Sequence, residues 1–354
     1  MGKKWVIGTL AFLGGSLMMI GGITVMIDPF FHYHKPLKGV YYNYGATDYY
    51  INNGMVRNLD YDALIIGTSM TSNFKMHEVD ELFGVKSLRV SFLGEGFKVI
   101  NDTLETAIES NPDLQMVIRG VDDTWFISEA DWEARETYPE YLYDDNLWND
   151  VYYLYNKSVY QDYIMPSIVN TVKKKNSRTL DQSGFGSREE TGKEQVLKTY
   201  ERKEKEIKKI DPAETEEFFR MLNENLDRNV LQVVKDNPNI EYYLFLPPYS
   251  IAWWDSLNQY GVEVVKRRID LQRFAIEKML EYDNVRVFSF YNNFDLICDF
   301  NNYVDITHYS AEVNSQIMHW MKEGKYELTK ENYQEYIEAI TEFYCNYDYD
   351  IIFG

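Results

Sequence analysis

The chain has 354 residues, 45% of them hydrophobic, and a formal net charge of −20 at pH 7. This apolar content excludes a disordered tail and suffices for the core of one large domain or two modest ones. The acidic balance disfavours a nucleic-acid partner, because a phosphate polymer binds clustered Lys and Arg.

The first predicted element is a membrane-spanning helix over residues 5–27, WVIGTLAFLGGSLMMIGGITVMI, which carries no charge. At a rise of about 1.5 Å per residue it exceeds the roughly 30 Å hydrocarbon core of a bilayer. The run is too long for a signal peptide and no small-x-small site precedes Asp28, so we expect an uncleaved anchor. Lys3 and Lys4 place residues 1–4 in the cytoplasm. The sequence therefore predicts a single-pass plasma-membrane protein whose main domain is extracytoplasmic.

Residues 28–60 are predicted to form a juxtamembrane linker. His32 and His34 lie in it, within FFHYH. We interpret them as part of an aromatic, amphipathic collar at the lipid headgroups, because no Cys or third His stands at ligand spacing. No metal or cofactor is expected.

From residue 61 to the end, apolar runs alternate with helical periodicities, which predicts one α/β domain. The expected strands are residues 62–67, 87–94, 114–121, 240–250 and 285–291. Helices are expected around residues 77–83, 99–108, 218–234 and 262–280. Continuous apolar strands joined by helical crossovers predict a doubly covered, parallel five-stranded sheet. Functional residues of such sheets lie at the carboxyl ends of the strands.

An insertion is predicted between the third and fourth strands, over residues 128–210. Its first half, PEYLYDDNLWNDVYYLYNKSVYQDYI, is rich in Tyr. It is either a helical subdomain that covers the rim of the sheet or an aromatic surface that stacks on sugar rings. The second half, VKKKNSRTLDQSGFGSREETGKEQ, predicts a polar surface loop.

Cys298 and Cys345 could form a disulfide or stay free, and the sequence leaves both open.

The stretch DALIIGTSMTSNF places Ser69 just after the first strand, either as a nucleophile or as a helix cap. A serine hydroxyl needs a base to remove its proton and a third group to orient that base. Of the five histidines, His308 lies in a polar loop beyond the fifth strand, NNYVDITHYSAEVNSQIM, three residues after Asp305. Its position favours a triad of Ser69, His308 and Asp305 above the carboxyl edge of the sheet.

These residues carry a resemblance to the SGNH/GDSL hydrolase superfamily. GTSM after the first strand, the glycine in SFLGEGF after the second and the terminal DITHYS look like three of its sequence blocks. DPFFHYHKP after the anchor and LFLPPYS on the fourth strand look typical of a membrane-anchored branch. That branch is similar to the D-alanine-transfer proteins of teichoic acid synthesis and other bacterial cell-surface O-acyl-transfer proteins. The similarity spans nearly the whole chain, and it implies a flavodoxin-like (SGNH) doubly wound sheet.

The resemblance further implies that the backbone N–H groups of Ser69 and Gly94 form an oxyanion hole, with Gly96 as the fallback donor. Thr68 replaces the usual Asp beside the serine, at a position that is mainly structural. The family also supplies an asparagine side chain as an oxyanion donor. This chain has Asp122 and Asp123 in the corresponding block, RGVDDTWF.

A carboxylate at that position would repel an oxyanion unless it were protonated, and one missing donor costs on the order of 10²- to 10³-fold in rate. Asn73 is the candidate substitute. Residues expected to line the pocket are Gly96, Asp122, Pro248 and Tyr249.

The sequence thus predicts an extracytoplasmic serine esterase or O-acyltransferase that acts, through an acyl-serine, on acyl esters of a cell-surface polysaccharide or teichoic-acid-like polymer. Expected partners are the acylated polymer or acyl donor and a membrane-bound O-acyltransferase. The alternative is a noncatalytic anchored protein of the same fold that binds a surface polymer or an acyltransferase partner. The Asp122 and Asp123 departure favours this alternative. The acyl group, the acceptor and the choice between hydrolysis and transfer stay open.

Overall fold

The computed structural model describes residues 2–44, 48–134, 139–174, 181 and 190–353. The chain divides into two compact units. The first contains residues 1–60 and 135–183, and the second contains residues 61–134 and 184–354. The predicted insertion is thus shared between them, and most of its expected polar loop lies outside the described residues.

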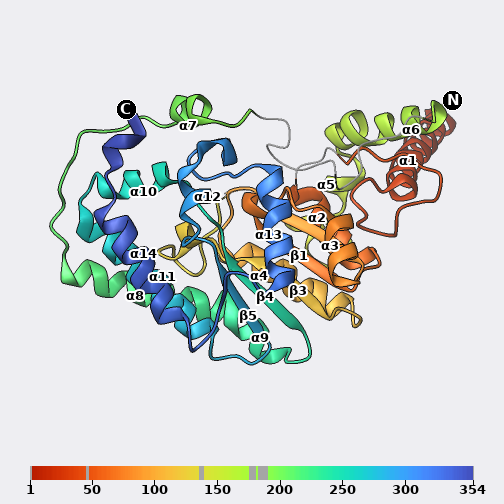
Figure 1. Ribbon diagram of the computed structural model, residues 1–354. Coiled ribbons are helices and arrows are strands. Elements are labelled where there is room, and N and C mark those ends of the chain that lie inside the picture. Colours follow the sequence, from red (N-terminus) through yellow and green to blue (C-terminus); the bar gives the residue numbers. More distant parts are fainter. Residues whose placement is uncertain (1, 45–47, 135–138, 175–180, 182–189, 354) are drawn as a thin grey trace. The chain divides into compact units, whose positions relative to one another are not determined.

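The first unit contains the apolar helix α1 (Gly2–Ile27), which starts three residues before the predicted span. It is the one helix in the described part of the chain that is long and apolar enough to cross a membrane. Figure 1 shows it beside the short helices of the Tyr-rich segment, which is helical. The other helices of this unit are α2 (Asp48–Asn58), η3 (Glu140–Leu142), α5 (Val151–Leu154), the π-helical η4 (Val159–Ile164) and α6 (Met165–Val172).

Asp28, the residue that follows α1, organises the start of the first unit. Its carboxylate accepts backbone N–H groups of His32 at 3.0 Å, Tyr33 at 2.7 Å and His34 at 3.0 Å. It also accepts the Tyr153 hydroxyl at 2.8 Å. Burial raises the pKa of Asp28, and these hydrogen bonds oppose the rise. Residues 28–60, predicted as a linker, therefore begin with a tightly bonded turn and form part of a folded unit.

The second unit is built on a six-stranded sheet in the order β2-β1-β3-β4-β5-β6. Its strands are β1 (Ala63–Thr68), β2 (Ser87–Phe92), β3 (Met116–Gly120), β4 (Glu241–Leu246), β5 (Val285–Ser289) and β6 (Glu327–Leu328). The five predicted strands are present and pair in parallel. The prediction of five strands is corrected by β6, an antiparallel edge strand. Two residues are too short to leave a periodic pattern in the sequence.

Helices cover both faces of the sheet, as parallel strands with apolar side chains require. On one face α3 (Met76–Phe83) contacts α13 (Ala311–Glu323). The opposite face holds α4 (Phe97–Ser110), α8 (Pro212–Leu226), η6 (Asp227–Leu231), α9 (Gln232–Asp236) and α11 (Val262–Met279), as Figure 1 shows. The remaining helices are α7 (Lys193–Thr199), α10 (Ile251–Asn258), α12 (Phe294–Cys298), α14 (Tyr333–Asn346), η7 (Phe300–Asn302) and η8 (Tyr349–Phe353). Cys298 and Cys345 are free thiols.

The strand order 2-1-3-4-5 reverses direction between β1 and β3. In doubly wound sheets the crevice at the carboxyl ends of such a pair of strands is the usual ligand site. Ser69 follows β1 directly, and Asp122 follows β3 after one residue. The sheet topology therefore brings both residues to its switch point.

Candidate active site

The turn that carries Ser69 is fixed by short polar contacts. Ser69 begins the 3₁₀ helix η1 (Ser69–Thr71), and the Thr68 hydroxyl caps it by accepting the Met70 N–H at 3.3 Å. The Ser72 hydroxyl donates to the Ser69 carbonyl at 2.7 Å. A Cβ on Gly67 would come within 2.7 Å of the Thr71 methyl group, so only glycine permits this close approach. The turn leaves the Ser69 side chain partly exposed.

Asp305 and His308 lie in a compact turn, in which the Asp305 carboxylate bonds two backbone N–H groups and the His308 ring. Asp305 Oδ1 accepts the N–H of Thr307 at 2.8 Å and that of His308 at 2.7 Å. Asp305 Oδ2 lies 2.7 Å from Nδ1 of the His308 ring. This arrangement places a proton on Nδ1 and leaves Nε2 as an acceptor.

Ser69 and His308 meet although 239 positions separate them. Ser69 Oγ lies 2.8 Å from His308 Nε2, which completes a hydrogen-bonded chain from Ser69 through His308 to Asp305. Separations of this length are those expected between a nucleophile, its base and the group that orients the base. The geometry is compatible with serine nucleophilic catalysis.

Two further contacts hold the His308 loop in place. The buried Tyr309 hydroxyl donates to the Met70 carbonyl at 2.9 Å. On the other side, Ser250 donates to the Ile306 carbonyl from its N–H at 3.1 Å and from its hydroxyl at 2.8 Å. The loop is therefore tied both to the Ser69 turn and to the segment that follows β4.

The electrostatics of the turn favour an ionised Asp305. Burial raises the pKa of its carboxyl, but the hydrogen bond and charge of His308, with the two backbone N–H groups, outweigh burial and lower the pKa to about 2. The side chains of His308 and Asp305 are 23% and 27% exposed, so the site stays in contact with solvent. A carboxylate that remains charged can support a positive imidazole.

Asp122 is buried, and both of its carboxylate oxygens accept hydrogen bonds. Its Oδ2 accepts the Thr68 hydroxyl at 3.0 Å. Its Oδ1 accepts the Thr124 N–H at 3.1 Å, the Thr124 hydroxyl at 2.6 Å and the Tyr249 hydroxyl. Asp122 thus links the residue before Ser69 to the ends of β3 and β4, and its contacts are those of a structural support.

Asp123 is fully buried and turned toward α11. Gln272 donates to its Oδ2 at 2.7 Å, and Arg268 donates to its backbone carbonyl at 2.6 Å. Burial raises the pKa of Asp123 to about 6, although Arg268 and Gln272 oppose the rise. Asp123 therefore sits in the packing between β3 and α11, where it contacts neither Ser69 nor His308.

The expected oxyanion donors have distinct surroundings. Gly94 lies in the turn after β2 with φ +73°, and its N–H makes no hydrogen bond among the described residues. Gly96 is buried, and a Cβ there would come within 2.9 Å of the Trp132 ring, so packing explains this glycine. The Oδ1 of Asn73 is buried and has no hydrogen-bond partner in the described part of the chain.

The residues expected to line a pocket are all buried. Tyr249 is 1% exposed and bonds Asp122, while the Pro248 carbonyl accepts the Tyr303 hydroxyl at 3.0 Å. Gly96 and Asp122 are buried as well, and within the described part of the chain Asp122 is the one of the four that bonds the Ser69 turn, through the Thr68 hydroxyl. The sequence places them near the site but gives no sign of the direction in which their side chains point.

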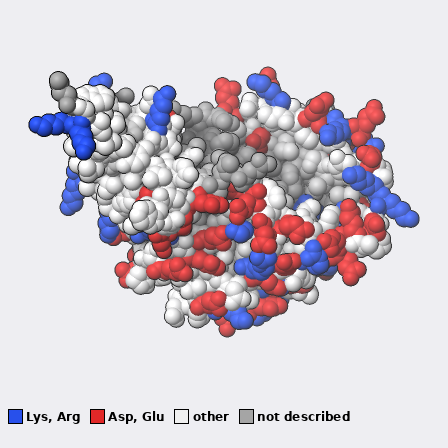
Figure 2. Space-filling view, turned by 180° about the vertical axis from the view of Figure 1, so that it is seen from behind, with Lys and Arg blue, Asp and Glu red and all other residues white. Residues whose placement is uncertain are grey.

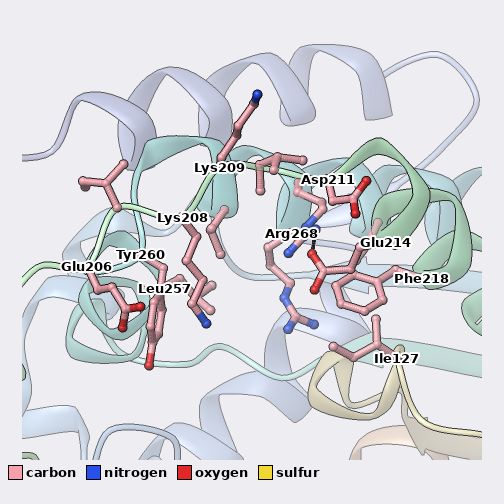
Figure 3. A pocket seen from close by; sticks show the side chains of 15 residues that line it. Ile127, Glu206, Lys208, Lys209, Asp211, Glu214, Phe218, Leu257, Tyr260 and Arg268 are labelled. Atoms are coloured by element: carbon pink, nitrogen blue, oxygen red, sulfur yellow. Dashed lines mark hydrogen bonds and ion pairs between the residues drawn. The ribbon is translucent and has the colours of Figure 1, made fainter.

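A separate cavity of about 560 Å³ is present in the second unit (Figure 3). Residues 206–211 and the helices α8, α10 and α11 surround it, and Ser69, His308 and Asp305 are not among its lining residues. Lys208 and Tyr260 both line the cavity, and Lys208 Nζ lies 4.2 Å from the centre of the Tyr260 ring. Arg268 lines the cavity and bonds Asp123, so the cavity adjoins the segment after β3 without reaching the Ser69 hydroxyl.

Sequence reasoning missed Tyr309 and Thr124, which hold the site from neighbouring elements. Tyr309 directly follows His308, so its place in DITHYS was a usable signal. Nothing in the sequence pairs Thr124 with Asp122, because Asx-type side-chain contacts depend on the local turn.

No protein-family model, curated protein or solved structure matches this chain. The fold and the site by themselves define an α/β protein with a Ser–His–Asp chain of hydrogen bonds at the switch point of a mostly parallel sheet.

Proposed function

We propose that the protein is a membrane-anchored SGNH-type serine esterase or O-acyltransferase that acts on acyl esters of a cell-surface polymer. One observation carries the proposal: Ser69 Oγ lies 2.8 Å from His308 Nε2, whose Nδ1 lies 2.7 Å from Asp305. A structural cap does not need an imidazole on its hydroxyl. The solvent-accessible edge and the switch-point location add support.

In the proposed reaction, Ser69 Oγ attacks the acyl carbonyl carbon and passes its proton to His308 Nε2. The C–O bond to the leaving alcohol breaks, and the alcohol takes that proton, which leaves an acyl-serine. An incoming hydroxyl then gives its proton to His308 Nε2 and attacks the acyl carbon. The acyl–Oγ bond breaks, and His308 returns the proton to Ser69 Oγ. Asp305 orients the ring through Nδ1 and stabilises its positive form.

The oxyanion would be bound by the backbone N–H groups of Ser69 and Gly94, with the Asn73 amide as a third donor. The Gly94 N–H, which makes no hydrogen bond among the described residues, supports its role as a donor. Asp122 is held by Thr68, Thr124 and Tyr249, so its carboxylate is directed into the protein. This structural use of Asp122 supports the proposal, since its carboxylate is occupied by hydrogen bonds from the protein.

A fluorophosphonate probe tests the proposal on the full-length protein in detergent. We expect covalent labelling of the wild type and none of Ser69→Ala, with the adduct mapped to the peptide that contains Ser69. The exposed Ser110→Ala is the matched control, since Ser110 lies at the end of α4. Equal labelling of wild type and Ser69→Ala would reject the nucleophile.

The noncatalytic alternative makes a different prediction for the same proteins. If the chain only binds a polymer, wild type and Ser69→Ala will both remain unlabelled and will bind acylated polymer equally.

If it is an acyltransferase, adding a polyol acceptor to an acyl-ester assay will divert acyl groups from water to the polyol. Release of free acid alone at all acceptor concentrations would restrict the activity to hydrolysis.

A further inference from the structure

Two short segments of the first unit expose apolar faces. Trp148, Val151, Tyr152 and Tyr155 recur at the spacing of one helical face, and their side chains are 90%, 49%, 66% and 43% exposed. In α6, Met165, Val169 and Val172 repeat the pattern with exposures of 51%, 39% and 79%. Contiguous apolar surface of this kind marks a binding surface.

The first of these segments, together with η4, packs against α1. Thr24 of α1 donates to the Leu154 carbonyl at 2.9 Å, and the Tyr160 hydroxyl donates to the Ile20 carbonyl. A Cβ on Gly21 would come within 3.2 Å of the Tyr155 hydroxyl. The Tyr-rich segment is therefore attached to α1 at the level of residues 20–24.

This level has a defined depth if α1 spans a bilayer. Ile20 precedes the last helical residue, Ile27, by seven positions, or roughly 10 Å along the axis. The uncharged stretch of residues 5–27 is about 34 Å long, against a hydrocarbon core of roughly 30 Å. Side chains that contact α1 at Ile20 to Thr24 then lie roughly 2–8 Å below the edge of the hydrocarbon core, a depth that interfacial elements reach.

The charges within the two exposed faces agree with this depth, and the exposed Lys157 and Asp162 lie between the two stretches. Helix α6 contains no charged residue, and the exposed Lys173 and Lys174 follow its end. Asp150 is 3% exposed and accepts the Tyr33 hydroxyl at 2.9 Å, so it points inward. On the face drawn in Figure 2, the N-terminal end of the chain carries mostly uncharged side chains and a few Lys or Arg, whereas Asp and Glu side chains are frequent over the sheet-containing part.

We propose that the exposed faces of residues 147–155 and 165–172 insert into the interfacial layer of the bilayer beside α1, as a monotopic membrane-binding element. Trp and Tyr rings are suited to this layer, because one part is apolar and another bonds water and headgroups. Continuity with the anchor favours lipid over a protein partner. The proposal rests on α1 spanning the membrane and is independent of the chemistry of Ser69.

Depth-dependent quenching tests it on the full chain. Cys298 and Cys345 are replaced by Ala, and Trp148→Cys, Tyr152→Cys or Val169→Cys is labelled with an environment-sensitive fluorophore. The proteins are reconstituted in phosphatidylcholine–phosphatidylglycerol vesicles that carry nitroxides at shallow or deep positions. Lys38→Cys, at an exposed charged position of the same unit, is the aqueous control, and Leu13→Cys in α1 reports the anchor.

We expect positions 148, 152 and 169 to be quenched by shallow nitroxides at least about twofold more than position 38, and to be shielded from iodide. Position 13 should be quenched best by deep nitroxides. If position 13 is inserted but iodide quenches positions 148, 152 and 169 as strongly as position 38, the proposal is overturned. The exposed faces would then be available to a protein partner instead of lipid. Failure of position 13 to insert would overturn it as well.

Discussion

The Tyr309 hydroxyl donates a hydrogen bond to the Met70 carbonyl at 2.9 Å, and this bond joins the residue after the candidate base to the residue after the candidate nucleophile. Tyr309 is 2% exposed. The distance between Ser69 and His308 therefore depends on a buried contact that takes no part in the proposed chemistry.

We expect Tyr309→Phe to slow fluorophosphonate labelling of Ser69 by on the order of tenfold, because a small displacement of a base from its nucleophile is costly. The unpaired Met70 carbonyl should lower the free energy of unfolding by about 1–3 kcal/mol. Labelling kinetics and urea unfolding measure the two effects. Tyr333→Phe is the matched control, since within the described residues its hydroxyl bonds only the exposed Gln334. Unchanged labelling in Tyr309→Phe would show that the contact does not position His308.

The sequence is enough to predict the candidate triad residues but not the contacts that hold them in place. Ser69 follows an apolar strand, and Asp305 and His308 form a local turn, so both have recognisable local patterns. The contacts of Tyr309 with Met70 and of Tyr249 with Asp122 join residues 239 and 127 positions apart. Such contacts depend on strand order and loop placement, which periodicity does not encode. For the same reason α1 and the Tyr-rich segment could not be assigned to one unit in advance.

The effect of Asp305→Asn on the free energy of unfolding should depend on pH. The folded-state pKa of Asp305 is lowered to about 2, below the roughly 4 of an unfolded Asp, so its stabilising contribution is complete above about pH 4 and is lost as pH falls toward 2. We expect the stability difference between wild type and Asp305→Asn to shrink over that window in acid-unfolding curves. A constant difference from pH 5 to 2 would contradict the lowered pKa.

The wild-type rate should rise with pH above the range in which Asp305 loses its proton, because the proposed mechanism needs an unprotonated base beside Ser69. Asp305→Asn should lower the rate by on the order of 10⁴-fold by favouring the wrong tautomer of His308. Hydrolysis of an acetyl ester at a series of pH values measures both. A flat wild-type profile would remove His308 as the base.

Asp122→Asn restores the residue type of the resembled family, yet we expect it to impair this protein. The Asp122 carboxylate accepts hydrogen bonds from Thr68, Thr124 and Tyr249, and an amide has one acceptor oxygen in place of two. The variant should lose about 1–3 kcal/mol of stability and should label more slowly. Thermal unfolding and labelling kinetics measure these changes. Faster labelling with unchanged stability would show instead that an asparagine here serves the oxyanion.

The stability of Asp123→Asn relative to wild type should rise with pH. Burial raises the folded-state pKa of Asp123 to about 6, so its favourable contribution is present below the unfolded value near 4 and is lost as pH rises through 6. An asparagine does not titrate and can still accept the Gln272 hydrogen bond at Oδ1. The variant should therefore gain roughly 2–3 kcal/mol relative to wild type between pH 4 and 7.5. Urea unfolding at the two pH values measures the gain, with the exposed Asp113→Asn as control. An equal difference at both would show that folding does not raise the pKa of Asp123.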